Sequence, residues 1–244
     1  MKKLIVAILL LAMLFSVALA EETLPDLSNI SAGDVVTFGS YEQNNLRNGL
    51  EPIEWIVLDV QDGKALLLSK YGLDDQKYNT DWTDVTWETC TLRTYLNKEF
   101  LRSAFNKTEQ QAILLTDVDN SDSQGYSEWR STGGNNTQDY IFLLSYAEAN
   151  KYLGVEYYEK ENADQNMKSR VAPTAYAIAW RAKTDSDYLT EDGEETGVWW
   201  LRSPGDFQNR AAAVYFSGSL VYRNVNLVGE CIRPAFWLNL NPDI

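Results

Sequence analysis

Residues 198–238, VWWLRSPGDFQNRAAAVYFSGSLVYRNVNLVGECIRPAFWL, decide the fold of this chain. The apolar run 198–201 at their start predicts an aromatic strand. This strand is expected to break at Ser203-Pro204-Gly205, because proline has no backbone N–H to donate and glycine tolerates a positive φ. The stretch therefore begins with one strand and a turn.

Further strands follow within the same stretch. The apolar run 211–216 and the shorter run 220–222 flank Ser217-Gly218-Ser219, which is typical of a hairpin loop. Residues 231–238 then close the chain with a last apolar run. Together these short strands predict a small antiparallel sheet with polar, aromatic-rich loops between them.

Several motifs resemble one bacterial family. They are W-W-x-R-S-P-G, A-x-V, G-S and R-P-A-F-W-L within residues 198–238, and VVTFGSY, EPIEWIVLDV, TLRTYLN and NNTQDYIFLLS earlier in the chain. This set is similar to the family known as domain of unknown function 6273, and the similarity covers nearly the whole chain after its first residues. The resemblance implies a family without implying a reaction.

A more distant resemblance concerns the fold. The W-x-R-S segment, the A-x-V strand, a turn and a final G-x-x-x-R-P strand are similar to the ending of C-type-lectin-like folds. That fold class includes the sulfatase-activating enzymes and retroelement-diversified binding proteins. The resemblance implies a single α+β domain with short antiparallel sheets and a few helices, C-type-lectin-like in its arrangement.

The first twenty residues predict a signal peptide. Lys2-Lys3 forms a charged start, residues 4–17 are almost wholly apolar, and Ala18-Leu19-Ala20 matches the A-x-A cleavage pattern. A membrane anchor is the disfavoured alternative, because the apolar run is shorter than the ~20 residues that a spanning helix needs. We therefore expect residues 1–20 to be removed. Residues 21–244 are then expected to form one globular domain of a secreted, extracellular or envelope-associated protein.

Composition narrows the classes of partner. The chain has 21 Lys and Arg against 35 Asp and Glu, a net charge of −14. Such a surface repels nucleic acid and anionic lipid headgroups. After the first twenty residues, no run is apolar for long enough to span a bilayer, and no linker or internal repeat divides the chain. We therefore expect neither a nucleic-acid partner nor a membrane span in the mature protein.

The two cysteines, Cys90 and Cys231, belong to a chain expected in an oxidising compartment. A disulfide between them would tie the start of a helix to the closing strand. Two buried free thiols are the alternative, and both remain open. Two cysteines are too few for a zinc site built from cysteine ligands.

The earlier part of the chain predicts both strands and helices, hence the α+β class. Strands are predicted over 34–38, 54–60 and 64–70, the last two joined by the hairpin signal Asp62-Gly63. Apolar residues at helical spacing within 92–105 predict helices.

The next part of the chain carries helix caps. Asn106 predicts the N-cap of a short helix, and Ser145 with Glu148 matches a capping box. Residues 140–144, just before that box, predict an apolar strand. Helices and strands are thus expected to alternate here.

The chain contains no histidine. Its absence removes Ser-His-Asp and Cys-His nucleophilic sites, His-ligated metals and the usual general base. No G-x-S-x-G, P-loop or dinucleotide motif is present, and Gly133-Gly134-Asn135 lacks the lysine of a phosphate loop. The sequence therefore predicts no catalytic residue.

A secreted glycoside hydrolase remains an alternative, because that chemistry needs only two Asp or Glu about 5–9 Å apart. Acidic residues gather in a predicted solvated loop, 184–196, which follows a helix predicted from Pro173 to Trp180. They are Asp185, Asp187, Glu191, Asp192, Glu194 and Glu195. No pair among them is marked by an apolar setting that would raise a pKa for acid catalysis.

One acidic stretch has the spacing of a calcium loop. Asp117, Asp119, Ser121 and Glu128 stand at positions 1, 3, 5 and 12 of that spacing. Position 6 is Asp122 rather than the glycine that permits the sharp turn, and the flanks do not predict two helices. A solvated loop is the favoured interpretation. If calcium is a cofactor, its ligands are Asp117, Asp119, Asp122 and Glu128; no other cofactor is expected.

Aromatic residues give the best functional indication, with eight Trp and 14 Tyr in the chain. Those in apolar runs are expected in the core: Trp55, Trp87, Trp199, Trp200 and Trp237. Arg202 and Arg233, in similar runs, are expected to pair with buried carboxylates or backbone carbonyls.

The turns of the C-terminal strands combine rigid aromatics with Asn, Gln and Arg, which suits a hydrogen-bonding contact surface. The predicted ligand-binding residues are Phe207, Gln208, Asn209, Arg210, Tyr215, Tyr222, Arg223, Asn224 and Asn226. Ordinary surface loops are the alternative. We therefore predict a non-catalytic module that binds an extracellular glycan or protein. The secreted hydrolase and a purely structural envelope protein remain the other possibilities.

Overall fold

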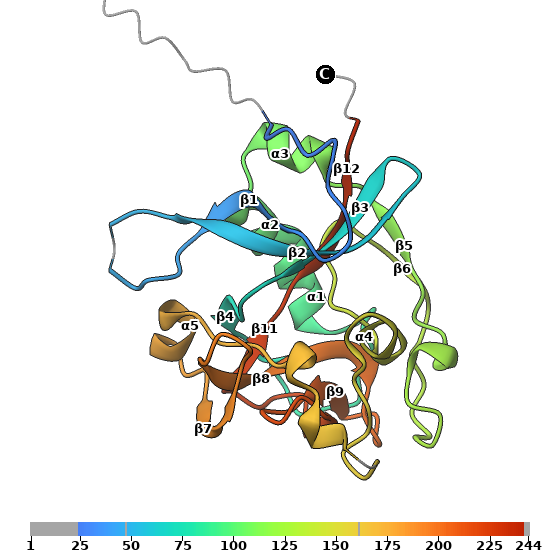
Figure 1. Ribbon diagram of the computed structural model, residues 1–244. Helices are drawn as coiled ribbons and strands as arrows, with labels where there is room; N and C mark the ends of the chain where they lie inside the picture. Colours follow the sequence, from blue (N-terminus) through green and yellow to red (C-terminus); the bar gives the residue numbers. More distant parts are fainter. Residues whose placement is uncertain (1–23, 47, 161, 242–244) are drawn as a thin grey trace, which may run out of the picture.

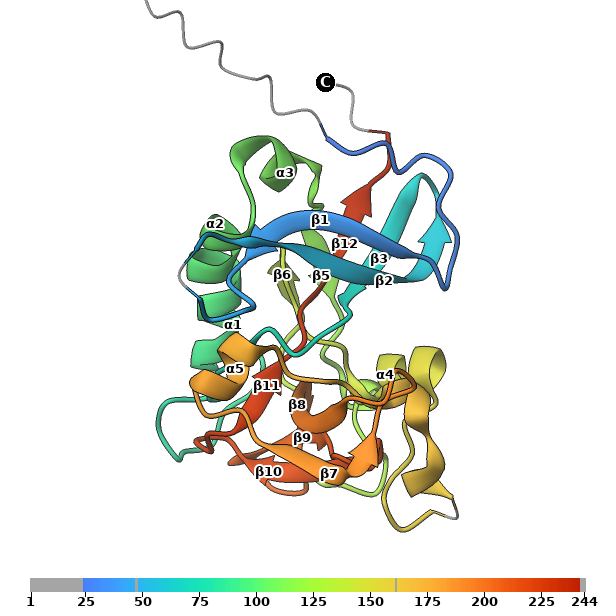
Figure 2. The same ribbon diagram turned by 60° about the vertical axis from the view of Figure 1, so that its left-hand side comes forward.

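The computed structural model describes residues 24–46, 48–160 and 162–241. The predicted signal peptide, residues 1–20, lies outside this part. Within it, Figures 1 and 2 show one sheet above another, with short helices beside both. The α+β class, with antiparallel pairing and few helices, is confirmed.

The upper sheet is antiparallel, with strand order β1-β2-β3-β12. Its strands are β1 (Val35–Tyr41), β2 (Glu51–Gln61), β3 (Lys64–Ser69) and β12 (Ala235–Asn239). The predicted hairpin joins β2 to β3, and its turn has positive φ at Asp62 (49°) and Gly63 (72°). Two left-handed residues in succession are what a tight Asp-Gly hairpin requires.

The lower sheet is mixed, with strand order β10-β9-β8-β11-β4 and β7 paired to β8. Its strands are β4 (Asp74–Asp75), β7 (Thr184–Leu189), β8 (Glu195–Pro204), β9 (Arg210–Val214), β10 (Leu220–Asn224) and β11 (Glu230–Ile232). A separate small sheet pairs β5 (Thr116–Val118) with β6 (Thr137–Asp139).

The closing segment of the chain links the upper and lower sheets. β11 runs parallel to β8, with Cys231 opposite Trp199, whereas β12 runs antiparallel to β3 from Ala235. The prediction of one small antiparallel sheet is therefore wrong for this segment. Pro234 has no N–H to continue a ladder, so pairing is interrupted there and the chain changes sheets through Arg233 and Pro234.

The helices are short. They are α1 (Thr91–Tyr95), α2 (Leu101–Ala104), α3 (Lys107–Ala112), α4 (Tyr146–Leu153) and α5 (Ala175–Ala179). A π-helical turn, η1 (Leu96–Phe100), joins α1 to α2, and 3-10 turns lie at η2 (Asp122–Gln124), η3 (Ala163–Gln165) and η4 (Met167–Ser169). Figure 1 shows α1, α2 and α3 near the upper sheet, and α4 and α5 beside the lower one.

The helix caps predicted at Asn106 and Ser145 are confirmed. Asn106 Oδ1 accepts from Glu109 N at 2.8 Å, while the Glu109 carboxylate accepts from Asn106 N at 2.8 Å. Ser145 and Glu148 form the same reciprocal box at the start of α4. Each box satisfies backbone donors that the first helical turn leaves without a partner.

Two of the predicted elements are wrong. Residues 140–144 are not a strand, because the first of their N–H groups donate to the Asn97 side chain and pairing is limited to a bridge between Phe142 and Ala235. Residues 184–196 are not a loop but a hairpin of β7 and the start of β8. Backbone pairing with β8 stabilises β7 without requiring an apolar face on it.

The predicted start of helix α5 is also wrong. Thr174 is the N-cap, because its hydroxyl accepts from Ala177 N at 3.1 Å. Pro173 therefore lies before the cap instead of in the first turn. It forms a bridge with Gly72, which holds this helix against the segment that follows β3.

Aromatic rings fill the core under the upper sheet. The rings of Trp55 and Phe236 lie 4.7 Å apart, and Phe105 lies 5.5 Å from Phe236. The buried indole of Trp55 donates from Nε1 to Phe38 O at 2.6 Å, as a buried tryptophan requires. Of the predicted core tryptophans, Trp55, Trp87, Trp199 and Trp200 are buried and Trp237 is partly buried.

Cys90 and Cys231 are separate buried thiols in this structure, so the disulfide alternative does not hold there. Cys90 caps α1, and its Sγ accepts from Arg93 N at 3.4 Å. Cys231 lies in β11 with its side chain packed against Gly72 and Gly197. Each sulfur is therefore enclosed by its own neighbours.

None of the helices formed by residues 24–46, 48–160 and 162–241 is long and apolar enough to cross a membrane.

Candidate binding site

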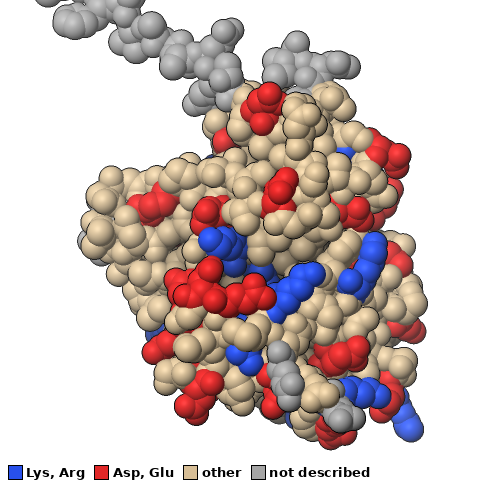
Figure 3. All heavy atoms as spheres, in the orientation of Figure 1, with Lys and Arg blue, Asp and Glu red and all other residues tan. Residues whose placement is uncertain are grey.

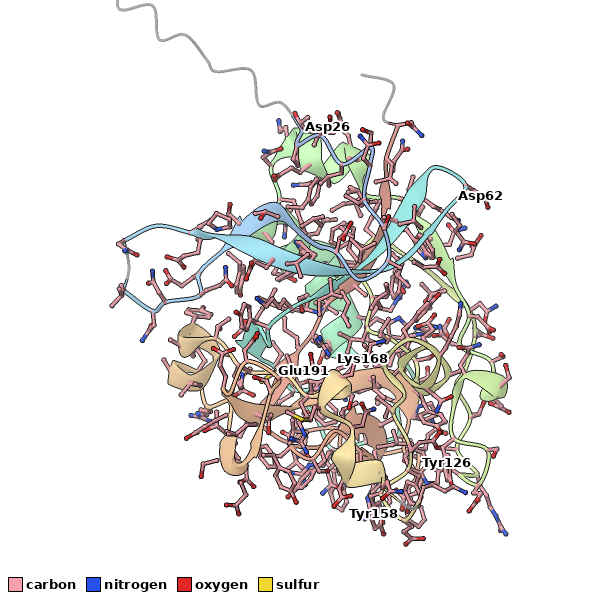
Figure 4. All side chains as sticks on the ribbon, in the orientation of Figure 1. Asp26, Asp62, Tyr126, Tyr158, Lys168 and Glu191 are labelled. Carbon is pink, nitrogen blue, oxygen red and sulfur yellow. The ribbon has the colours of Figure 1, made fainter. Side chains whose placement is uncertain are left out.

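Aromatic side chains from several loops form a continuous cluster beside the lower sheet, called here the aromatic face. Its members are Tyr126, Trp129, Tyr157, Tyr158, Phe207 and Tyr222. The ring of Trp129 lies 5.7 Å from Tyr222 and 5.9 Å from Tyr157, which lies 4.6 Å from Tyr158. Figure 4 labels Tyr126 and Tyr158 near the lower end of the molecule. Phe207 and Tyr158 are 61% and 49% exposed, whereas Trp129, Tyr157 and Tyr222 are partly buried and Tyr126 is buried.

Arg210 connects Phe207 to the rest of the aromatic face. Its Cζ lies 5.2 Å from the ring centroid of Phe207 and 5.0 Å from that of Tyr222. The Asp206 carboxylate accepts from Arg210 Nη1 at 2.9 Å, and Asn224 Oδ1 accepts from Arg210 Nε at 3.2 Å. These bonds fix the guanidinium between two rings, where each cation–π contact contributes about 0.5–1 kcal/mol at an exposed site.

The β9–β10 hairpin sets these positions. Arg210 stands opposite Asn224, and Ala212 stands opposite Tyr222. Because side chains alternate along a strand, Tyr222 and Asn224 share one face of β10 while Arg223 points to the other. The register therefore brings the Tyr222 ring to the guanidinium of Arg210.

A neighbouring segment brings Tyr157 to the same face. Leu220 N at the start of β10 donates to Glu156 O at 2.7 Å, and Tyr158 N donates to Leu220 O at 3.2 Å. This short parallel pairing extends the edge of the lower sheet. Tyr157 thereby comes within contact distance of Trp129, which lies far from it in the sequence.

A pocket of about 430 Å³ opens beside Trp129. Its wall combines the rings of Tyr126 and Trp129 with polar groups. The polar side chains are Asp122, Ser127, Arg130 and Ser131. Ser131 Oγ donates to Gly205 O, which ties this loop to the end of β8. Flat rings next to hydrogen-bonding side chains make a site that holds an amphipathic ligand in one orientation.

The structure brings together four of the nine predicted ligand-binding residues: Phe207, Arg210, Tyr222 and Asn224. Gln208 has a structural role instead. Its Nε2 donates to Val85 O and Thr132 O, and its Oε1 accepts from Thr132 N. Gln208 therefore ties two loops to the turn before β9.

The other predicted residues lie apart from the aromatic face or in turns. Tyr215 is at the opposite end of the hairpin, where its ring packs on Phe216 at 4.8 Å. Arg223 pairs with the buried Glu230 carboxylate at 2.9 Å. Asn209 uses its carbonyl to accept from the N–H of residue 225, and Asn226 lies in the turn after β10.

The sequence interpretation missed Tyr126, Trp129, Tyr157 and Tyr158. A signal was present, because these rings stand in the polar runs QGYSEW and EYYEK, where no core position is expected. An aromatic residue surrounded by polar neighbours is a stronger indication of a contact surface than one in an apolar strand. Only the tertiary structure places these residues beside Tyr222.

The predicted calcium ligands do not converge. Three of the four are held by different donors: Asp117 by Gln138 Nε2, Asp119 by Ser121 N and Asp122 by Gly133 N. Among the described residues, no three Asp, Glu, Cys or His side chains lie together as a metal site. β5 and the turn η2 interrupt the continuous loop that would wind around an ion, and calcium binding stays a prediction.

Arg202 has the structural pairing that its sequence context predicts. Nη1 and Nη2 bind the two carboxylate oxygens of Glu148. The remaining donors reach Asn120 Oδ1 at 3.2 Å, Leu143 O at 2.9 Å and Asp119 O at 2.9 Å. The guanidinium is 2% exposed and has a partner for each of its nitrogens.

Two carboxyl groups have raised pKa values. Burial raises the pKa of Asp75 and of Glu230, and a neighbouring negative charge adds to each effect, that of Asp74 on Asp75 and that of Asp75 on Glu230. Asp75 lines a shallow pocket beside Trp180, whereas Glu230 does not line it and is held by Arg223. The predicted acidic cluster is spread over β7, the β7–β8 turn and the start of β8.

The comparisons with known proteins assign the chain to a family. The family described as "Domain of unknown function (DUF6273)" matches residues 62–240, a span that includes every strand from β3 to β12. No curated protein and no solved structure matches the chain. Nothing in these comparisons points to an enzyme. The chain belongs to the DUF6273 family, as its motifs indicate.

Proposed function

We propose that this protein is a non-catalytic binding module that recognises an extracellular glycan through its aromatic face. One observation carries the proposal. Five side chains form an unbroken row in which neighbours lie 5.0–5.9 Å apart. In order they are Phe207, Arg210, Tyr222, Trp129 and Tyr157. Such a row offers successive flat surfaces to an extended ligand.

The chemistry of the face favours a sugar. A sugar ring has an apolar C–H face, which packs on an aromatic ring, and hydroxyls at its edge, which need hydrogen-bond partners. Trp129 and Tyr126 supply the rings of the pocket, and Asp122, Ser127 and Arg130 supply polar partners. The net charge of −14 opposes anionic polymers, so a neutral glycan is the expected ligand.

An extracellular protein is the second ligand class. Trp, Tyr and Arg are the residues that dominate protein–protein hot spots, and the aromatic face contains Trp and Tyr, with Arg210 between two of its rings. The other two possibilities, a secreted hydrolase and a purely structural envelope protein, make different predictions. A hydrolase would use a pair such as Asp75 and Glu230, and a purely structural envelope protein would use neither site.

Export, a bacterial origin and a C-type-lectin-like arrangement are further parts of the proposal. Export is supported by the charged and apolar segment 1–20 with its A-x-A ending. The lectin-like arrangement is supported by the W-x-R-S motif within β8 and by the R-P pair just before β12. A recognition surface at the C-terminal strands is consistent with that arrangement.

The test is a glycan array and a protein pull-down with residues 21–244. Trp129→Ala, Tyr222→Ala and Phe207→Ala are expected to lower affinity at least about tenfold, the equivalent of about 1.4 kcal/mol for a lost ring contact. Trp180→Ala and Tyr140→Ala are matched controls, because both side chains are exposed and lie outside the face. Circular dichroism confirms that each variant is folded.

Equal losses in the face variants and the controls would contradict the proposal. Binding of a protein without any glycan would replace the glycan with the second ligand class. Turnover of a glycan that Asp75→Asn abolishes would establish the hydrolase alternative.

A further inference from the structure

A second pocket lies between the upper and lower sheets, away from the aromatic face. Its volume is about 290 Å³. Val35 and Ile56 of the upper sheet line one side, and the turn 190–194 between β7 and β8 lines another. Figure 4 labels two of its lining residues, Lys168 and Glu191, near the middle of the molecule.

Arg233 forms part of the wall of this pocket and is 1% exposed. Its Nε donates to Ser69 O at 2.9 Å, and its Cζ lies 5.0 Å from the ring centroid of Trp199. Nη1 is buried and has no hydrogen-bond partner among the described residues. The predicted pairing with a backbone carbonyl is therefore met at one nitrogen only.

Comparison with Arg202 shows that Arg233 lacks a carboxylate partner. Arg202 is equally buried, but its charge is met by the Glu148 carboxylate. The ion pairs of the described residues do not include Arg233. A buried charge without a partner is strongly unfavourable, so an anion next to Arg233 would be favoured.

The pocket is positively charged at its base. Burial lowers the pKa of Arg233 to about 9, which still leaves the guanidinium protonated at neutral pH. Lys168 adds positive charge to the wall, whereas the charge of Lys70 is met by Glu54 at 3.3 Å. Arg170 is already occupied, because its three nitrogens donate to backbone carbonyls. Figure 3 shows Lys and Arg beside Asp and Glu across the middle of this face.

The remaining lining restricts the ligand. Most of the wall is apolar, with Val35, Ile56, Tyr71, Met167 and Val171. The rim carries the exposed carboxylates Glu191, Asp192 and Glu194, which repel a dianion such as phosphate more than a monoanion. An apolar wall with one buried guanidinium suits a ligand that has one negative end.

We propose that this pocket binds a small monoanionic carboxylate with an apolar body, with the carboxylate on Arg233. A carboxylate oxygen gives Nη1 the acceptor that it lacks and neutralises the buried charge. The apolar body lies along Val35, Ile56 and Val171. This site is separate from the aromatic face, and it is independent of the glycan proposal.

The test uses hexanoate and N-acetyl-leucine as carboxylate probes, with N-acetyl-leucine amide and inorganic phosphate at equal ionic strength. Isothermal titration on residues 21–244 is expected to give saturable binding of both carboxylates and weaker binding of the amide and of phosphate. Arg233→Met, which keeps the side-chain length without the charge, is expected to lower carboxylate affinity at least about tenfold. Arg102→Met is the matched control, because Arg102 is exposed.

A second measurement needs no variant. Carboxylates are expected to raise the Tm of the wild-type chain and to shift the NMR signal of the Arg233 Nε–H, and the amide is expected to do neither. Without ligand, Arg233→Met is expected to melt no lower than the wild type, since it removes an unpaired buried charge. The proposal is overturned if neither carboxylate binds, if the amide or phosphate binds as tightly, or if Arg233→Met binds like Arg102→Met.

Discussion

Arg202 and Glu148 join β8 to α4 through two hydrogen bonds, from Nη1 and Nη2 to the two carboxylate oxygens. Glu148 also accepts from Ser145 N at 2.9 Å, so the same carboxylate closes a capping box. One side chain thus neutralises a buried charge and begins a helix.

Glu148→Ala is therefore expected to lower the free energy of unfolding by about 3–5 kcal/mol, because it leaves the Arg202 guanidinium buried without a counter-charge. Glu99→Ala is the control. It breaks only the exposed pair between Glu99 and Arg102 at 3.9 Å, which contributes less than about 1 kcal/mol. Urea denaturation measures both. Similar losses in the two variants would show that the Arg202 pair contributes little.

Arg210 tests the aromatic face without removing a ring. Arg210→Met is expected to weaken glycan binding about three- to tenfold, because the cation that fixes Phe207 and Tyr222 is lost while the Tm changes little. Arg102→Met, which makes the same chemical change away from the face, is expected to bind as the wild type does. If Arg210→Met bound the glycan with unchanged affinity, the guanidinium would have no part in binding.

The raised pKa of Asp75 predicts that the stability of the protein depends on pH. Burial raises its pKa above the usual 3.8, so the folded state holds the proton more tightly than the unfolded state. Its contribution to stability is present at low pH and is lost as the pH rises through the raised pKa. Asp75→Asn avoids the buried charge, so it is expected to be more stable than the wild type at pH 7. The difference should disappear as the pH falls below the usual pKa of 3.8, where Asp75 becomes protonated in both states.

Asp26 provides a control of opposite sign for this prediction. Hydrogen bonds from Ser28 lower the pKa of Asp26, so its contribution to stability is present at neutral pH and is lost as the pH falls through the lowered pKa. Asp26→Asn is expected to be no more stable than the wild type at pH 7. Thermal melts of both variants between pH 3 and pH 7 measure the two trends. If the stabilities of the two variants, relative to the wild type, changed with pH in the same direction, the opposite pKa shifts of Asp75 and Asp26 would be contradicted.

The two cysteine thiols are expected to react slowly with an alkylating reagent. Burial raises the pKa of Cys90 to about 12 and that of Cys231 well above its usual value. Neither thiol should react with iodoacetamide in the folded protein, because the thiolate is the reactive form. Both should react in guanidinium chloride. Intact mass measures the labels, and two unlabelled cysteines in the denatured, unreduced chain would establish the disulfide instead.

Calcium provides a further test of the loop that contains Asp117, Asp119, Asp122 and Glu128. A ligand that binds only the folded state raises the Tm. Because Asp117, Asp119 and Asp122 accept from separate donors, calcium and a chelator are expected to leave the Tm unchanged within about 1 °C. A calcium-dependent rise that Asp119→Asn abolishes would restore the calcium prediction.

Local signals in the sequence predicted the local parts of this fold. The Asp62-Gly63 turn and the caps at Asn106 and Ser145 depend on residues no more than a few positions apart, so their patterns are complete in the sequence. The signals failed where a strand is stabilised by the strand beside it and not by a pattern in its own residues. β7 forms because β8 lies beside it, and the acidic residues within 184–196 show no strand pattern of their own.

The candidate site was predictable in the same partial way. Phe207, Arg210, Tyr222 and Asn224 lie on one hairpin, and their spacing in the sequence already places them near one another. Trp129 and the Tyr157–Tyr158 pair reach that hairpin only through loops that pack against it. Their contact distances depend on chain segments separated by tens of residues, and no local pattern encodes them.

The sequence by itself determined the α+β class, the DUF6273 family, the buried tryptophans and the aromatic character of the C-terminal strands. These follow from residue type and short-range spacing. Only the tertiary structure decided that β11 and β12 join different sheets, and that Arg202 meets a carboxylate while Arg233 does not. The two arginines stand in similar apolar runs, so the difference comes from which distant side chain the folded chain brings to each guanidinium.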